Sequence, residues 1–275
     1  MKDIALEQLI DRALVEDAPG GDVTTLATVP ADKEITGRFL AKEDGVLCGI
    51  DVAAAVYARL DESITFEKKK NDGDAFRKGD ILATVSGSAR AILTGERVAL
   101  NLLQHLTGIA TKTAEAVKKV AGTNAKIADT RKTTPGLRTL EKYAVRCGGG
   151  SNHRYGLSDG ILIKDNHIAA AGGITAAVTG AKKAAPHTMK IEVEVETFPQ
   201  LEEALNAGAD IIMLDNRSCA DMKKAVAIVA GRALTEASGN MGDRDLKEVA
   251  DTGVDLISIG ALTHSVKAAD ISLKF

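Results

Sequence analysis

A chain of 275 residues with a formal net charge of −3 can hold one large domain or two modest ones, with ample material for a core. Aromatic residues make up 3% of it and tryptophan is absent, whereas small aliphatic residues are plentiful, a profile typical of α/β proteins. The slightly acidic charge argues against a nucleic-acid groove, and no apolar run approaches the length that spans a membrane.

Three cysteines, Cys48, Cys147 and Cys219, stand far apart in the sequence and form no Cys-x-x-Cys pair. This spacing argues against a disulfide framework or a zinc site, and we expect each cysteine to be a small apolar residue. The amphipathic N-terminal segment lacks the apolar stretch of a signal peptide. The pattern therefore predicts a protein of the reducing cytoplasm.

The first part of the chain mixes helical and strand-like patterns. Helices are predicted from about Asp3 to Asp17 and near Val52–Leu60, and tight turns such as NDGD separate strand-like runs. These runs are Ile35–Ala41, Ile64–Lys68 and Ile81–Val85. A long helical pattern from Thr94 to Val120, interrupted at Gly108, leads into the rest of the chain.

A regular alternation of strands and helices begins after residue 110. The strand candidates are Lys126–Ala128, Gly160–Ile163, Met189–Val195, Asp210–Leu214, Ala233–Thr235 and Asp255–Ile259. Helical patterns between them include Ala176–Ala184, Leu201–Ala207, Ala220–Val229 and Asp245–Thr252. This alternation predicts a parallel sheet with right-handed crossovers. About six units, without a GxGxxG motif after the first strand, favour a closed or nearly closed β/α barrel over a doubly wound sheet.

Polar or glycine residues follow each predicted strand of this second part. Examples are Asp129-Thr130-Arg131-Lys132, Lys164-Asp165-Asn166-His167 and Asp215-Asn216. Since β/α barrels carry their chemistry at the carboxyl ends of the strands, we expect these residues to meet at one rim.

The segment KIEVEVE is the sharpest local pattern. Strand side chains alternate, so Glu192, Glu194 and Glu196 should share one face, opposite Ile191, Val193 and Val195. We expect the aliphatic face to meet the helices and the glutamates to point into the barrel, where cations such as Arg131 and Lys164, or Mg²⁺, would offset their desolvation. The alternative is an edge strand with one charged face in solvent.

Two glycine-containing turns end the last two strands, Ser238-Gly239-Asn240 and Gly260-Ala261. Backbone N–H groups in such turns, together with a following helix N-terminus, can bind a phosphate. Ordinary turns at the start of helices are the alternative.

Cations are concentrated between Ala128 and His167, in a chain that is acidic as a whole. The set comprises Arg131, Lys132, Arg138, His153, Arg154 and Lys164, beside the Gly148-Gly149-Gly150 loop. This pattern predicts a pocket for a small, highly charged anion, with a solvated basic face as the alternative. His105, His187 and His264 are isolated and are expected to be structural or surface groups.

Six segments carry the most specific motifs: EDAPGGDVTT, ADTRKTTPGLRTLEKYAVRCGGGSNHRYGLSDGILIKDNHI, IEVEVET, IIMLDN, EASGN and ISIGALTHS. They resemble the quinolinate phosphoribosyltransferase family over nearly the whole chain. The resemblance implies a type II phosphoribosyltransferase fold, with an N-terminal α/β sandwich domain (residues 1–108) and an incomplete, TIM-like β/α barrel (residues 109–265). The C-terminal tail, residues 266–275, can pack back on the first domain.

The activity implied by the resemblance belongs to NAD biosynthesis. A pentosyltransferase of this family transfers the phosphoribosyl group of 5-phosphoribosyl-1-pyrophosphate to quinolinate, giving nicotinate mononucleotide, pyrophosphate and CO₂, with Mg²⁺ as cofactor. The family also implies a homodimer or a larger homo-oligomer, in which Arg97 reaches the site of the neighbouring subunit. From the residues alone, Arg97 stands by itself on a helix and would be a solvated arginine.

Matching motifs also imply roles for the barrel residues. Arg131, Lys132, His153, Arg154 and Lys164 would bind the quinolinate carboxylates and nearby phosphates, and Thr130 would join them through its backbone or hydroxyl. Glu194 and Asp215 would face the ribose and Mg²⁺, and these two with Lys132 and Lys164 would form the catalytic group. The 5-phosphate would lie against Ser238, Gly239, Asn240, Gly260 and Ala261. Some members have SGG in place of Ser238-Gly239-Asn240, and Asn240 is expected to preserve phosphate binding because asparagine tolerates unusual φ and can donate.

Several other functions remain open at the level of sequence. Within the same fold, a molybdenum-transport-associated protein and phosphoribosyltransferases that accept nicotinate resemble this family. A Schiff-base aldolase would use Lys164 as its nucleophile. A non-catalytic anion sensor would bind its ligand without turnover, and it would leave the KIEVEVE strand unexplained.

Overall fold

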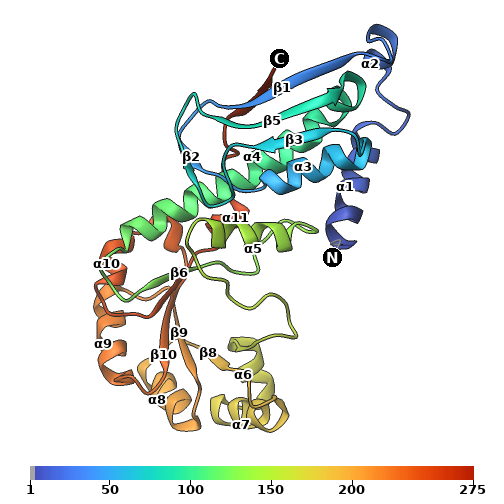
Figure 1. The fold of residues 1–275 in the computed structure, drawn as a ribbon. Helices are drawn as coiled ribbons and strands as arrows, with labels where there is room; N and C mark the ends of the chain where they lie inside the picture. The colour runs from blue at the N-terminus through green and yellow to red at the C-terminus, as the bar shows by residue number, and fades with distance from the viewer. Residues whose placement is uncertain (1–3) are drawn as a thin grey trace. The chain divides into compact units, whose positions relative to one another are not determined.

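The computed structural model describes residues 4–275, so the first residue of the helix predicted from Asp3 lies outside the described part. The chain divides into two compact units (Figure 1). The first unit holds residues up to Lys112, Thr139–Gly149 and Val266–Phe275, and the second holds Thr113–Arg138 and Gly150–Ser265. This division differs from the predicted boundary at residue 108 because most of one helix, α5 (Arg138–Cys147), groups with the first unit.

An antiparallel sheet with strand order β12-β1-β5-β3 organises the first unit. Its strands are β1 (Glu34–Ala41), β3 (Thr65–Lys68), β5 (Ile81–Ser88) and β12 (Ile271–Lys274). The C-terminal tail forms β12, which pairs with β1 through Phe39 opposite Leu273. A short pair, β2 (Gly45–Val46) and β4 (Ala75–Phe76), lies outside this sheet.

Helices cover one face of that sheet, as Figure 1 shows for α3 (Ile50–Leu60) and α4 (Ala89–Lys119). Alternation in β1 explains the one-sided cover, since Phe39 and Ala41 are buried in the core while Arg38 is exposed. The N-terminal helices are α1 (Ile4–Asp17) and α2 (Val23–Thr28).

Helix α4 runs through Gly108, so the predicted interruption at this glycine is wrong. A Cβ at position 108 would lie 2.2 Å from the carbonyl oxygen of Lys267. The glycine is therefore explained by the close approach of the C-terminal segment, which a helix can accommodate at a cost of about 1 kcal/mol.

A six-stranded parallel sheet forms the second unit, in the order β6-β11-β10-β9-β8-β7. Its strands are β6 (Lys126–Ala128), β7 (Ile161–Ile163), β8 (Ile191–Val195), β9 (Ile211–Asp215), β10 (Leu234–Ser238) and β11 (Leu256–Ser258). The helices of this unit are α6 (Asp165–Ala171), α7 (Ile174–Ala184), α8 (Phe198–Ala207), α9 (Cys219–Val229), α10 (Leu246–Ala250), α11 (Ala261–His264) and the 3₁₀ turn η1 (Met241–Asp243).

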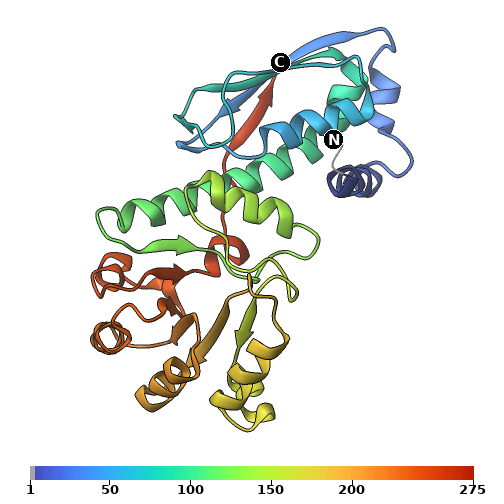
Figure 2. The same cartoon turned by 60° about the horizontal axis from the view of Figure 1, so that its bottom comes forward.

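The strands curve into an arc with the yellow and orange helices on its outer side (Figure 2). The two end strands, β6 and β7, are not neighbours in the sheet, so the barrel is incomplete as predicted. Local sequence explains where the helices begin. In α8, the hydroxyl of Thr197 accepts from the N–H of Gln200, whose side-chain oxygen in turn accepts from the N–H of Thr197.

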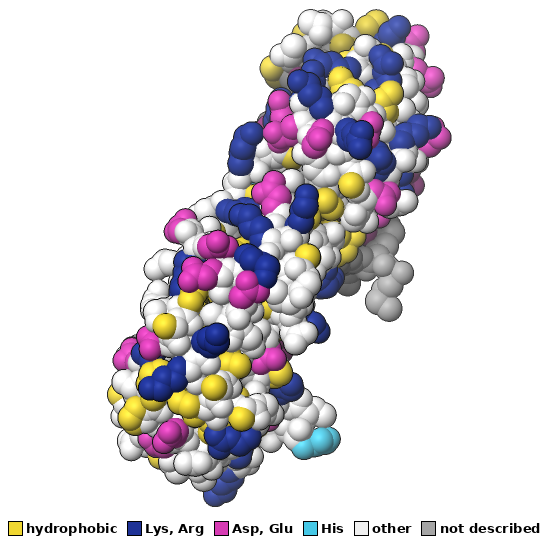
Figure 3. Space-filling view, turned by 90° about the vertical axis from the view of Figure 1, so that its left-hand side faces the viewer, with side chains coloured by type: hydrophobic (Ala, Val, Ile, Leu, Met, Phe, Trp, Pro, Cys, Tyr) yellow, Lys and Arg dark blue, Asp and Glu magenta, His cyan; other side chains and the backbone are white. Residues whose placement is uncertain are grey.

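Among the helices of residues 4–275, none is both long and apolar enough to cross a membrane. On the face drawn in Figure 3, Lys and Arg side chains are interspersed with Asp and Glu.

Candidate active site

A cavity of about 540 Å³ opens at the carboxyl ends of the barrel strands. It gathers every predicted site residue of the second unit: Thr130, Arg131, Lys132, His153, Arg154, Lys164, Glu194, Asp215, Ser238, Gly239, Asn240, Gly260 and Ala261. The remaining predicted residue, Arg97, is exposed on α4 in the first unit and is not among the lining residues. Parallel strands bring these distant segments together because their carboxyl ends share one edge of the sheet.

Two guanidinium groups, those of Arg131 and Arg154, give one wall of the cavity an excess of positive charge. Burial, followed by the nearby charge of Arg131, lowers the pKa of Arg154. The Nε of Arg131 is buried and has no hydrogen-bond partner among residues 4–275. A buried donor without a partner costs free energy, so this wall suits an anion that accepts from it.

Arg138 does not line the cavity but fastens the loops that do. Its Nε donates to the hydroxyl of Thr133 (2.9 Å), and its terminal nitrogens donate to the carbonyls of Tyr155 (3.2 Å) and Arg131 (3.4 Å). Arg138, which was predicted to belong to the cationic set of the pocket, therefore stabilises the backbone of the loop that carries Arg131.

Opposite charges meet on the wall formed by β7 and β8. The ammonium of Lys164 lies 2.7 Å from Oε2 of Glu194, whose side chain is 15% exposed. Asp215, at the end of the neighbouring strand β9, accepts from the side-chain amide of Asn216 at 2.6 Å. The Lys164 ammonium is thus held against a carboxylate at the edge of the cavity.

Buried carboxylates occupy the barrel interior beneath the cavity. Glu192 on β8 and Glu236 on β10 are 3% and 1% exposed, and alternate strands of a barrel place side chains in one layer. Burial and the charge of Glu192 raise the pKa of Glu236 to about 7. The prediction from KIEVEVE is thus confirmed for Glu192 and Glu194 but wrong for Glu196, which lies just beyond β8 and is exposed.

His153 lies between these two glutamates. Its Nε2 is 3.0 Å from a carboxylate oxygen of Glu192 and 3.6 Å from one of Glu236, while its Nδ1 accepts from the N–H of Arg154 at 2.7 Å. This pattern places the proton of a neutral ring on Nε2. Asp129, at the end of β6, accepts from the N–H of His153 at 2.9 Å and so positions the segment.

The loop after β10 turns through two consecutive residues with positive φ, Gly239 and Asn240. Gly239 has φ 87°, and a Cβ there would lie 2.3 Å from the side-chain oxygen of Asn216, so only glycine fits. Asn240 adopts φ 51°, which confirms the expectation that asparagine would tolerate an unusual φ at this position. The helical segments that follow β10 and β11 hold 3 and 4 residues, so the expected helix dipole adds little at this end of the cavity.

Two lining residues, Ser258 and His264, were not among the residues expected at the rim. His264 was expected to be an isolated structural or surface group, and that prediction is wrong because α11 brings it to the cavity. Asn216, which was expected at this rim, lines the cavity, and Ser258 is the last residue of β11, where inspection of strand ends could have found it. His105, by contrast, pairs with buried Glu141 at 2.8 Å.

Two groups of side chains in the barrel could hold a metal ion. Glu194 and Asp215 offer carboxylate oxygens to the cavity, which is the ligand type that Mg²⁺ prefers. His153, Glu192 and Glu236 place ligand atoms within 4.8 Å of one another, but a ring nitrogen suits Mg²⁺ less well. The residues present therefore fit Mg²⁺ best at Glu194 and Asp215.

Comparison with known families identifies the chain. Residues 22–107 match the model of the quinolinate phosphoribosyl transferase N-terminal domain, and residues 109–274 match that of its C-terminal domain. The chain belongs to the quinolinate phosphoribosyltransferase family. Both domains of the family are thus present in the order that the sequence motifs predicted.

Individual members of the family are similar over almost their full length. The nicotinate-nucleotide pyrophosphorylase [carboxylating] of Mycobacterium leprae is 46% identical over 278 residues, which cover 98% of this chain and 96% of that protein. A chloroplastic relative from Arabidopsis thaliana is 44% identical over 98% of this chain and 82% of its own length. The structure of the nicotinate-nucleotide pyrophosphorylase from Francisella tularensis has a TM-score of 0.96 at 42% identity, covering 100% of this chain and 97% of that one.

Proposed function

We propose that the chain transfers the phosphoribosyl group of 5-phosphoribosyl-1-pyrophosphate to the ring nitrogen of quinolinate, releasing pyrophosphate and CO₂ and forming nicotinate mononucleotide. Membership of the family supports the overall reaction. The observation that carries the assignment is that this cavity is lined by two groups of opposite charge. One holds Arg131 with its unpartnered buried donor, and the other holds the carboxylates of Glu194 and Asp215.

The cationic wall suits the acceptor. Arg131 and Arg154 would receive the carboxylates of quinolinate through bidentate hydrogen bonds, with Lys132, Thr130 and His153 on the same wall. Quinolinate carries two carboxylates, so it matches two neighbouring guanidinium groups better than nicotinate, which carries one. Fixed donors would also hold the ring nitrogen near the anomeric carbon of the donor sugar.

The carboxylate wall suits the ribose. Loss of pyrophosphate gives the anomeric carbon oxocarbenium character, and Glu194 and Asp215 would stabilise that positive charge. Lys164 would keep Glu194 in place through their ion pair and would contact departing phosphate oxygens. Attack by the ring nitrogen makes the ring cationic, so the electron pair left by departing CO₂ is stabilised before a proton replaces it. No side-chain nucleophile is needed.

Mg²⁺ is the proposed cofactor. Glu194 and Asp215 would hold it together with phosphate oxygens of the donor, where it would neutralise charge on the leaving pyrophosphate. The 5-phosphate of the donor would accept from backbone N–H groups of the Ser238-Gly239-Asn240 turn and of Gly260-Ala261, which line the same cavity.

We also propose that the active form is a homodimer or a larger homo-oligomer, with Arg97 of one subunit completing the site of another. The family resemblance supports this role, and the exposure of Arg97 leaves its guanidinium available for it. A cytoplasmic location is compatible with the three free cysteines.

A Schiff-base aldolase is disfavoured by the contacts of Lys164. A Schiff-base lysine needs its amine free to attack a carbonyl carbon, whereas the Nζ of Lys164 is engaged by Glu194 at 2.7 Å. Borohydride should therefore trap no carbonyl substrate on this lysine.

Acceptor selectivity tests the proposal. The protein is incubated with 5-phosphoribosyl-1-pyrophosphate, Mg²⁺ and either quinolinate or nicotinate at equal concentration, and nicotinate mononucleotide is followed by chromatography. We expect product from quinolinate and at least about tenfold less from nicotinate, which lacks one charge-assisted contact. Equal rates with both acceptors would overturn the assignment of the cationic wall, and binding of both substrates without product would indicate an anion-binding protein.

A further inference from the structure

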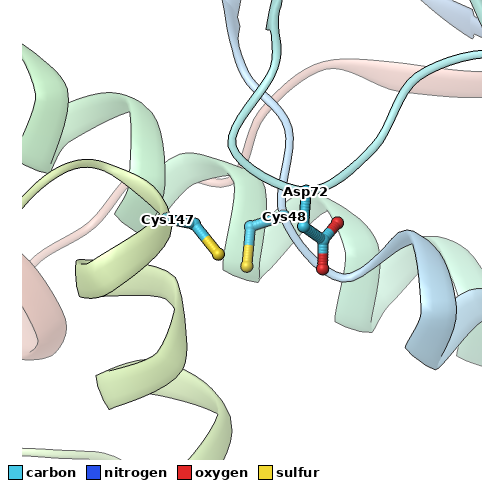
Figure 4. A group of neighbouring side chains, drawn as sticks. All are labelled: Cys48, Asp72 and Cys147. Carbon is cyan, nitrogen blue, oxygen red and sulfur yellow. The ribbon is translucent and has the colours of Figure 1, made fainter.

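Two cysteines that the sequence separates widely lie together in the first unit. Cys48 follows β2, Asp72 lies in the turn between β3 and β4, and Cys147 ends α5. The two sulfur atoms and a carboxylate oxygen of Asp72 all lie within 4.8 Å of one another. Figure 4 shows these three side chains pointing into one shared space from three different segments. The wide spacing of the cysteines in the sequence gave no sign that Cys48 and Cys147 lie together in the fold.

Backbone hydrogen bonds fix the segments that carry the first two groups. The N–H of Cys48 donates to the hydroxyl of Thr107 (3.2 Å), and that hydroxyl donates to the carbonyl of Cys48 (3.0 Å). The turn that contains Asp72 is attached to the same segment, because the N–H of Gly73 donates to the carbonyl of Leu47 at 2.8 Å. The positions of the ligand atoms are thus set by the fold of this unit.

The carboxylate of Asp72 is oriented by two further contacts. One oxygen accepts from the N–H of Ile50 at 3.0 Å, and the other accepts from the phenol of Tyr143 at 3.0 Å. Tyr143 precedes Cys147 by four residues on α5, so one helix supplies both a sulfur atom and the group that orients the carboxylate. Metal-bound carboxylates are commonly held by such outer hydrogen bonds.

We propose that Cys48, Cys147 and Asp72 bind one Zn²⁺ ion through two thiolates and one carboxylate. Two sulfur ligands and one oxygen ligand suit Zn²⁺ rather than Mg²⁺ or Ca²⁺, and a water molecule would complete the tetrahedron. On binding, both thiols lose their protons to solvent and two zinc–sulfur bonds form, so no oxidant or reductant is involved. The ion would fasten the Cys48 segment, the Asp72 turn and the end of α5 to one another.

A disulfide between Cys48 and Cys147 is the competing use of the same two sulfur atoms. A disulfide would use only the two sulfur atoms, whereas a metal ion would also use the carboxylate of Asp72 that lies beside them. This difference favours the zinc site, and the experiment below separates the two.

Metal titration of the full-length protein tests the site. Reduced, metal-free protein is titrated with Zn²⁺ by calorimetry, and with Co²⁺ by following the thiolate-to-metal charge-transfer absorption. We expect about one equivalent of either ion per chain. Cys147→Ser should weaken Zn²⁺ binding by roughly 100-fold and lower the charge-transfer absorption of each bound Co²⁺, because one of the two thiolates is lost.

Two variants accompany this measurement. Cys219→Ser is the matched control, because Cys219 lies on α9 in the second unit and contacts Arg244 at 3.2 Å, and its titration should match that of the wild type. Asp72→Asn retains an oxygen acceptor but loses the charge. If Cys147→Ser fails to fold, Asp72→Asn can be titrated in its place. It should weaken Zn²⁺ binding at least about tenfold.

Equal Zn²⁺ binding by the wild type, Cys147→Ser and Asp72→Asn would overturn the proposal, as would a reduced wild type that binds no Zn²⁺. Mass spectrometry of protein purified without reductant shows whether Cys48 and Cys147 form a disulfide. A Cys48–Cys147 disulfide in protein that fails to bind Zn²⁺ after reduction would assign the pair to redox chemistry instead.

Discussion

Three titratable side chains, those of His153, Glu192 and Glu236, lie in contact in the barrel interior. The Nε2 of His153 lies 3.0 Å from Glu192, and its Nδ1 accepts from the backbone N–H of Arg154. Glu236, buried beside Glu192, has a pKa raised to about 7. Two adjacent carboxylates beneath a polyanion site are therefore held with less than two full negative charges near neutral pH.

Substitution of Glu236 by Gln should change how stability depends on pH. In the wild type the folded-state pKa lies above the unfolded value of 4.5, so the protonated form stabilises the fold at low pH. The free energy of unfolding should then fall by about 3 kcal/mol as pH rises from 4.5 to 7, relative to Glu236→Gln. Urea unfolding of both proteins across this range measures the difference. Parallel pH profiles for the two proteins would show that Glu236 does not titrate as described.

Sequence alternation predicted that Glu192 and Glu194 point inward, because a strand has only two faces. It could not predict that His153 and Glu236 meet Glu192. Those residues come from other segments, and only the closing of the sheet brings them within hydrogen-bonding distance. It also failed for Glu196, because the strand ends one residue earlier and alternation then no longer applies.

Among the structural elements, the turn after β10 shows the closest fit between sequence and backbone. Gly239 combines a positive φ with contact to Asn216, and the N–H of Asn216 donates to the carbonyl of Ser238 at 3.0 Å. These contacts hold the ends of β9 and β10 together at the edge of the cavity.

Gly239→Ala should distort this turn. The added Cβ meets Asn216 and must adopt φ near 87°, so we expect a loss of about 1–2 kcal/mol in the free energy of unfolding. If the turn binds the 5-phosphate as proposed, the KM for 5-phosphoribosyl-1-pyrophosphate should rise more than that for quinolinate.

Gly180→Ala provides the control for that substitution. Gly180 lies inside α7 with nothing within 4 Å of the added Cβ, so alanine should stabilise the protein by about 0.5–1 kcal/mol and leave both KM values unchanged. Equal KM values for wild type and Gly239→Ala would remove the turn from the phosphate site.

Most helices and strands were predictable because their apolar periods and caps are local features. Gly108 was the exception at this level: a glycine inside a helical pattern usually suggests a break, but here the reason lies in the distant C-terminal segment. Boundaries such as the beginning of α4 at Ala89, ahead of the predicted Thr94, depend on how the preceding strand β5 ends.

For the whole molecule, the barrel supplies all but one of the predicted site residues, and Arg97 is the exception. Neither the sequence nor the single chain assigns it a partner. The proposed role of Arg97 depends on contact with a second subunit, and the local sequence around Arg97 does not predict which residues of another subunit it would meet.

Subunit mixing tests that role. Arg97→Ala and Lys164→Ala should each lower kcat/KM by roughly 10- to 100-fold or more, because each removes a charged contact. If each site takes Arg97 from one subunit and Lys164 from another, mixed dimers regain one intact site. Refolding the two variants together should then restore roughly a quarter of the wild-type activity. Activity that stays at the level of the separate variants would place Arg97 outside the neighbouring site.

The reaction itself is measured most directly with quinolinate labelled in the carboxylate next to the ring nitrogen. With 5-phosphoribosyl-1-pyrophosphate and Mg²⁺ present, we expect one labelled CO₂ for each nicotinate mononucleotide formed, and no CO₂ when the phosphoribosyl donor is omitted. Lys164→Ala should release almost none. Binding of both substrates without CO₂ or mononucleotide, or CO₂ release independent of the donor, would contradict the account.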